Sequence, residues 1–310
     1  FNVWTGEPRL IEPKMSTVDI IYGHGSTCKS RSCRCDDKTS LLNLYGPYNM
    51  LKLGSFVPNK SPTSQEDIAL IELGRTVGRD TFGMVKYHGR FTLDEMHVLW
   101  TQNFAHGLFF QVDLPIRHMK LSNVLCEDVS PCNGPCPNRH TRTWQTFLNL
   151  YNKILGRYDL CAGGFNHTSL SDISTSLGWG CNYQDTRVLD YIDMSCMVGM
   201  LFPSGRKKNV NHAFDMPSGY NGHLGFGANA QLSIGMYNWL TFGGYAGAIA
   251  LLDRTYVVRL KTDIRQNGLI KLAKGCANVE RGAIWNGGAY GKMDHFVGGF
   301  SLLCGYSYSA

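Results

Sequence analysis

The stretch that decides the fold is LGFGANAQLSIGM, residues 224–236. Its even-numbered positions are all apolar, and its odd-numbered positions are glycine, serine, asparagine or glutamine. Strict alternation sends the two sets to opposite faces of a β-strand. The 13 residues exceed the about 5–6 of an ordinary strand and satisfy the about 9–11 of a membrane-spanning strand. Alone, the stretch fits a barrel wall between lipid and water as well as it fits a long sandwich strand with one solvated face.

The same alternation recurs at 96–116, 171–183 and 295–308. Residues 90–104 and 108–121 read as a hairpin around Ala105-His106-Gly107. Short turns alternate with long connections along the chain, as in bacterial barrels, whereas a sandwich would turn every about 8–12 residues. We therefore expect an all-β fold, an antiparallel transmembrane β-barrel of about 12 or more strands that forms a single domain over the whole chain, residues 1–310.

Helical patterns are few. Ser64 is a candidate N-cap, followed by acidic residues in a first turn. Residues 143–160 place Trp144, Phe147, Tyr151 and Ile154 on one stripe at three- and four-residue steps. We expect one short amphipathic helix in a loop, packed on the barrel edge or folded inward as a plug. The alternative is a small helical cap on a soluble domain.

The composition is rich in glycine and aromatic residues at the expense of charge. Apolar residues make up 43% and charged residues 17%, against about 25% charged in ordinary soluble domains. No apolar run is long enough for a transmembrane helix. The net charge of +6 is spread along the chain without a nucleic-acid-binding motif, so we expect no nucleic-acid partner.

The chain contains 11 cysteines, an odd number. Those clustered in polar loops are candidates for disulfides in an oxidising compartment: Cys28, Cys33, Cys35, Cys126, Cys132 and Cys136. Free thiols and a metal site are the alternatives, although the spacings miss the common CxxC pairs. The odd total leaves one thiol for a bridge between chains.

These patterns resemble Gram-negative outer-membrane β-barrel proteins of the porin type. The resemblance is carried by residues 221–253, 96–116 and 295–309. It implies a closed barrel that passes solutes across an outer membrane. Outer-membrane barrels commonly finish on a terminal Phe or Trp, whereas this chain stops at Ser309-Ala310 within an alternating run. We expect that the barrel is incomplete at its C-terminus or that another element closes it. The many cysteines resemble those of some envelope proteins of intracellular bacteria.

No motif selects a catalytic set. Gly225-Phe-Gly-Ala-Asn-Ala formally matches a dinucleotide fingerprint, but the alternation continues where a helix should begin. Asp294 and His295 are neighbours that point to opposite faces of a strand. We expect no enzymatic activity, no cofactor and no metal.

The functional hypothesis is a channel that passes small hydrophilic solutes by passive diffusion through a polar lumen. The pore-lining candidates are Asn229, Gln231, Ser233, Gln111, Asp113, Arg259 and Lys261. The two basic residues in this set would favour anions. The candidates for lipid contact are Leu224, Phe226, Leu232 and Ile234. We expect a bacterial outer-membrane location, membrane lipid and small solutes as partners, and a homo-oligomer. The alternative is a surface-exposed all-β structural or binding protein cross-linked by cysteines.

Overall fold

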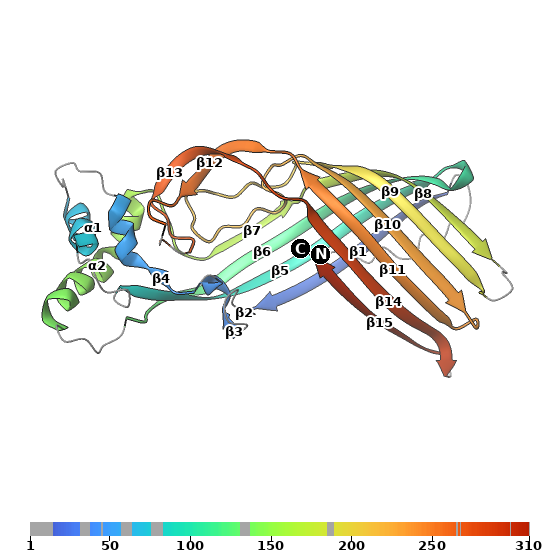
Figure 1. Cartoon of the computed structure of the whole chain (residues 1–310), viewed down its shortest axis with the longest axis horizontal. Coiled ribbons are helices and arrows are strands. Elements are labelled where there is room, and N and C mark those ends of the chain that lie inside the picture. The colour runs from blue at the N-terminus through green and yellow to red at the C-terminus, as the bar shows by residue number, and fades with distance from the viewer. Residues whose placement is uncertain are drawn as a thin grey trace.

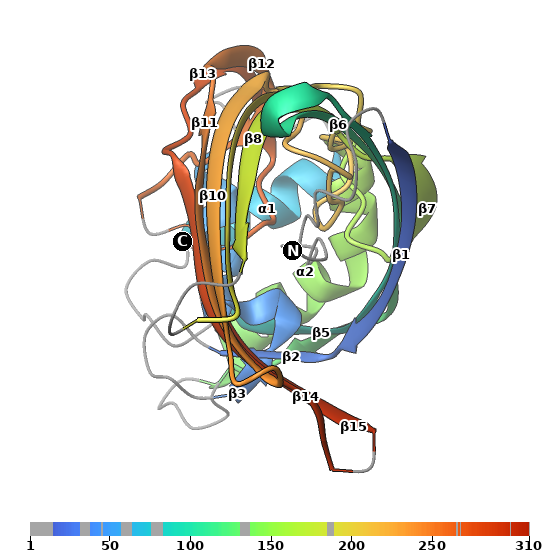
Figure 2. The same ribbon diagram turned by 90° about the vertical axis from the view of Figure 1, so that its right-hand side faces the viewer.

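The computed structural model describes residues 15–31, 38–44, 46–56, 64–75, 83–130, 137–184, 189–264, 266, 268–297 and 299–309. Antiparallel strands dominate it. The main sheet has eleven strands among these residues, in the order β1-β5-β6-β8-β9-β10-β11-β14-β15, with β4 beside β5 and β7 beside β6. Figures 1 and 2 show this sheet curling into an open arc, with β1 and β15 at its two edges.

The strands of the arc are long and regular. They are β1 (Ser16–Thr27), β4 (Tyr48–Asn49), β5 (Met84–Asn103), β6 (Leu108–Asp128), β7 (Phe165–Leu170), β8 (Ile173–Gln184), β9 (Tyr191–Phe202), β10 (Gly225–Met236), β11 (Leu240–Leu251), β14 (Ile284–Val297) and β15 (Phe300–Ser309). The expected strand at 224–236 and the expected hairpin around Ala105-His106-Gly107 are confirmed. In that hairpin His106 and Gly107 both have positive φ.

Short and long connections lie at opposite ends of the arc (Figure 1). Short turns join β5 to β6, β8 to β9, β10 to β11 and β14 to β15. The described parts of the long connections, which span residues 28–83, 129–164, 203–224 and 252–283, lie at the other end. This is the alternation expected from the sequence.

A helical cap occupies the long-connection end. It contains α1 (Gln65–Arg75), α2 (Pro137–Arg157) and the 3₁₀ turns η1 (Leu41–Asn43) and η2 (Met50–Phe56). The Ser64 hydroxyl accepts the Asp67 backbone N–H at 3.2 Å, which confirms the predicted N-cap. The predicted stripe of α2 is buried, with Phe147 and Ile154 both 0% exposed. It packs with α1 residues and with Phe214 in the main hydrophobic core.

Three stretches of the chain are organised in ways that alternation alone does not indicate. Residues 41–44 and 46–53 form η1, β4 and most of η2, because Gly46 takes a φ of 85° and Pro47 cannot extend a ladder. Residues 295–308 form the turn and second arm of a hairpin, because the chain reverses at Gly299, whose φ is 86°. Residues 254–260 form β12 (Arg254–Leu260), which pairs with β13 (Ala273–Val279) in a separate two-stranded sheet. A further pair, β2 (Lys29–Arg31) and β3 (Lys38–Ser40), lies near β1 in the sequence.

The two faces of the arc differ in chemistry. On β8–β11, β15 and β14 up to Met293, none of the outward positions among the described residues is charged. Large apolar side chains stand exposed there, such as Val198 at 63%, Trp285 at 62% and Leu177 at 53%. The outward face becomes polar toward the long connections, where Asp94 bonds Tyr22 and His118 contacts Thr168. The uncharged outward surface is therefore a band that ends on the side of the long connections.

No helix among the described residues is both long enough and apolar enough to cross a membrane.

Candidate functional site

A cavity of about 280 Å³ lies on the concave face of the arc. Its wall comes from β5, β6, β8, β9, β10, β11 and β14. Its polar lining comprises His97, Gln111, Asp113, Arg117, Ser171, Asp172, Ser174, Thr175, Ser176, Tyr220, Asn229 and Asn286. Alternation along each strand brings most of these side chains to the inner face, while their apolar neighbours face outward.

Four charged side chains form a chain of contacts on β5 and β6. Arg117 Nε donates to Glu95 Oε1 at 2.6 Å, and His97 Nε2 lies 3.0 Å from the same oxygen. His97 Nδ1 lies 3.0 Å from Asp113 Oδ1. Glu95 and His97 are buried. Because each imidazole nitrogen faces a carboxylate, both contacts are hydrogen bonds only when both nitrogens carry protons. In that protonation state, the negative charges of Glu95 and Asp113 are balanced by the positive charges of Arg117 and His97.

The connection between β9 and β10, residues 203–224 and here named the strap, lies on the concave side of the sheet (Figure 2). It is fastened where β7 ends and β8 begins. β7 and β8 both pair with β6, and the register of this pairing shifts at Ser171 and Asp172. Both of these residues are buried. Asp172 accepts the backbone N–H groups of Gly205 and Tyr220, and the hydroxyl of Ser171 donates to the carbonyl of Ser218. A break in a strand that re-aims side chains is a recurrent feature near functional sites.

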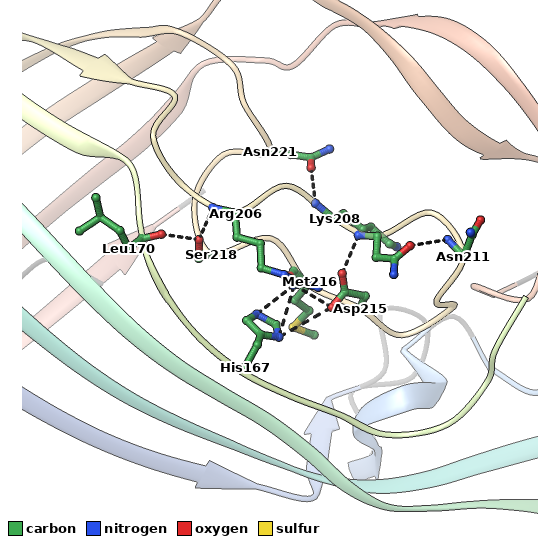
Figure 3. A network of polar contacts seen from close by, with 10 residues as sticks. His167, Leu170, Arg206, Lys208, Asn211, Asp215, Met216, Ser218 and Asn221 are labelled. Carbon is green, nitrogen blue, oxygen red and sulfur yellow. Dashed lines mark hydrogen bonds and ion pairs between the residues drawn. The ribbon is translucent and has the colours of Figure 1, made fainter.

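The strap is also held by its own residues (Figure 3). The Ser218 hydroxyl donates to Leu170 O at 2.8 Å and accepts the Arg206 backbone N–H at 2.7 Å. Arg206 Nη1 donates to Asp215 Oδ1 at 3.0 Å and contacts the ring of His167. Burial and the Arg206 charge lower the pKa of His167, although Asp215 opposes this shift. The strap thus has a fixed shape on the concave side of the arc, at the long-connection end.

Arg259 ties the strap to the β12–β13 hairpin. Its guanidinium donates to the carbonyl oxygens of Val210, Tyr158, Leu272 and Asp159 at 2.6–3.0 Å. Arg254 of β12 donates to Gly222 O, and His223 Nδ1 contacts Leu252 O at 2.8 Å. Burial lowers the pKa of Arg259, which Asp159 partly offsets.

The structure separates the predicted pore-lining residues into two groups. Gln111, Asp113 and Asn229 line the cavity together. Gln231 and Ser233 share the inner face of β10 with Asn229, and Ser233 is 1% exposed. Arg259 and Lys261 lie elsewhere: Arg259 is on β12 of the separate sheet, and Lys261 is the exposed residue that follows β12. These two side chains are not among the residues that line the cavity.

The predicted lipid-facing residues lie on or next to the outer face. Phe226 and Leu232 are 45% and 43% exposed, Ile234 is partly buried, and Leu224 directly precedes β10. Contact with lipid stays a prediction.

Cys28 and Cys126 are free thiols, as are the other five cysteines among the described residues. Cys33, Cys35, Cys132 and Cys136 lie outside those residues. The disulfides therefore stay a prediction. Where the chain is described, no three His, Cys, Asp or Glu side chains gather as a metal site would require.

Sequence reasoning missed the residues that fasten the strap. Ser171 and Asp172 begin the alternating stretch 171–183, and the pattern of residues 203–222 indicates only a polar connection with glycine and proline. The sequence of the strap does contain residue types that favour turns and local hydrogen bonds to the backbone. They are Pro203, Gly205, Asp215, Ser218 and Gly219.

Comparison with known proteins found neither a matching family model nor a matching curated protein.

Proposed function

We propose that this chain forms the wall of an outer-membrane channel that passes small hydrophilic solutes by passive diffusion. The observation that carries the proposal is the contrast between the two faces of one curved sheet. The outward positions of β8–β11, β15 and most of β14 are uncharged and expose large apolar side chains, whereas the inner face carries a cavity whose lining includes the charged and polar groups of His97, Asp113 and Arg117. Exposed apolar surface on this scale marks a membrane or protein contact.

In this proposal the membrane-spanning part is the uncharged band: β8–β11, β14, β15, β1 up to Tyr22, and the stretches of β5 and β6 between Met96 and Ile116. The cap, β7, the strap and the β12–β13 hairpin lie beyond the band. Short turns on one side and long connections on the other are the arrangement of bacterial barrels.

The proposal requires the edges of β1 and β15 to be paired, because open edges do not persist in a hydrocarbon layer. β1 pairs with β5 and β15 pairs with β14 through one edge each, within the described residues. Further strands between these two edges would complete a barrel of about 12 or more strands.

The strap would narrow such a channel, because it is fixed on the concave side at Ser171 and Asp172. Solutes would then pass between the strap and the polar wall. The cavity there is lined by amides, hydroxyls and the side chains of His97, Asp113 and Arg117, together with apolar side chains such as Leu99 and Ile249. The polar groups among them can bind small hydrophilic solutes.

Reconstitution tests the proposal. We expect that the purified chain requires detergent, and that it produces discrete conductance steps in planar lipid bilayers. A reversal potential in a salt gradient then shows whether the channel selects between anions and cations. If the protein stays soluble and monomeric without detergent and gives no conductance, the channel is excluded and the cysteine-linked binding or structural protein becomes the better reading.

A further inference from the structure

The excess of positive over negative charge in this chain comes from two connections that are separate in the sequence. The strap and the connection 252–283 together contain ten Lys and Arg residues and four Asp and Glu residues, which accounts for the whole net charge of +6. The remaining residues contain twenty of each kind. Both connections lie at the long-connection end of the arc (Figure 1). These two connections are therefore basic, and the remaining residues together carry no net charge.

Arg259 draws the two basic connections together. One guanidinium donates through Nε to Val210 O of the strap at 2.8 Å and through Nη1 to Leu272 O at 2.8 Å. Lys208 lies two residues before Val210, and Lys271 lies directly before Leu272. Arg259 thus holds together two backbone segments that each carry a lysine and that are far apart in the sequence.

The nearby carboxylates are already engaged. Asp215 pairs with Arg206 at 3.0 Å and accepts the Asn209 backbone N–H at 2.6 Å. Asp159 pairs with Lys274 at 3.2 Å. By contrast, no carboxylate of the described residues lies within 4.0 Å of the ammonium group of Lys208 or Lys271.

Both lysines are partly buried. Burial lowers the pKa of Lys208, and the charge of Lys271 adds to this shift while Asp215 opposes it. Burial and the charge of Lys261 lower the pKa of Lys271. The ammonium groups have therefore lost part of their hydration and repel one another. A bound multivalent oxyanion would relieve both costs.

We propose that Lys208 and Lys271 form a binding site for a phosphate group at the junction of the strap and the β12–β13 hairpin. A phosphate group carries about −1.5 to −2 charges at pH 7 and three strong acceptor oxygens, which suits two ammonium groups carried by segments that Arg259 holds together. The group belongs to a free phosphate-bearing solute or to a lipid headgroup, since the chemistry of recognition is the same.

The test is calorimetric titration of the full chain in a non-ionic detergent with inorganic phosphate. A parallel arm measures flotation with vesicles of phosphatidylcholine, with and without phosphatidylglycerol. We expect saturable phosphate binding that weakens with added salt. Each change, Lys208→Met or Lys271→Met, should weaken it about tenfold, as for the loss of one charge-assisted hydrogen bond. The double change Lys208→Arg, Lys271→Arg should retain binding.

Lys153→Met is the matched control, because Lys153 is an exposed lysine on α2. Binding of free phosphate assigns the site to a solute, and lysine-dependent flotation with the anionic vesicles alone assigns it to a headgroup. Absence of both, or methionine variants that bind like the unchanged chain, overturns the inference. The outcome is separable from the channel: conductance without binding rejects only this site, and binding without conductance rejects only the channel.

Discussion

Asp172 accepts the backbone N–H of Gly205 at 2.8 Å, so a side chain at the break between two strands holds the start of the strap. Its second oxygen accepts the N–H of Tyr220 near the other end of the strap. Gly219 lies so close that a Cβ there would stand 2.2 Å from the Asp172 carboxylate. One carboxylate therefore clamps both ends of the strap against the wall.

We predict that Asp172→Ala frees the strap. Two charge-assisted hydrogen bonds are lost and two backbone N–H groups are left without their acceptor, at a cost of about 2–4 kcal/mol to the attachment. Amide hydrogen exchange in residues 203–222 should accelerate, and single-channel current should become noisier. Asp253→Ala removes an exposed carboxylate after β11 and should leave both readings unchanged. Unaltered exchange in Asp172→Ala would show that the strap is held by other contacts.

We predict that adjacent positions on β10 respond oppositely to a bulky side chain. Asn229→Trp places an indole in the cavity and should lower single-channel conductance, because it takes up solute volume. Ala230→Trp faces outward and should leave conductance unchanged. Equal effects of both changes would contradict the assignment of the two faces.

Aromatic rings on the inner face lie directly over glycines of neighbouring strands, which makes the wall sensitive to added atoms. A Cβ on Gly243 would stand 2.2 Å from the ring of Tyr290 on β14. We predict that Gly243→Ala costs about 1–3 kcal/mol of unfolding free energy, as overpacking does. Gly227→Ala is the control, because its nearest neighbour would be 3.5 Å away. Denaturant unfolding in detergent compares the two variants, and equal midpoints would contradict the packing.

We predict that phosphate binding weakens at a lower pH than it would if both lysines had the ordinary pKa of about 10.4. Lowered pKa values mean that Lys208 and Lys271 lose their protons at lower pH, and the neutral amines no longer attract the anion. The charge of phosphate is nearly constant above pH 7, since its second pKa is about 6. Titrations between pH 7 and 10 measure the effect. In the Lys208→Arg, Lys271→Arg variant the guanidinium groups stay protonated, so binding should be flat over this range.

Local pattern was sufficient to predict most of the sheet. The alternation at 224–236 placed Phe226 and Asn229 on opposite faces, and the structure keeps them there, because side-chain direction in a strand depends only on a period of two. Ser64 and the stripe on α2 were equally readable, since capping and helical periodicity are local. Arg259 was misjudged for the opposite reason: it alternates like a wall residue, yet its strand pairs outside the main sheet.

The sequence by itself determined which side chains share a face, where the chain turns tightly and how polar each face is. Tertiary structure alone decided that the strap lies on the concave side of the sheet. It also decided that Asp172 holds the strap and that Arg259 joins the strap to the hairpin. Those contacts link residues such as Arg259 and Tyr158, which are 101 positions apart. Their formation depends on the curvature of the whole sheet and on where each long connection returns, and no local period encodes either.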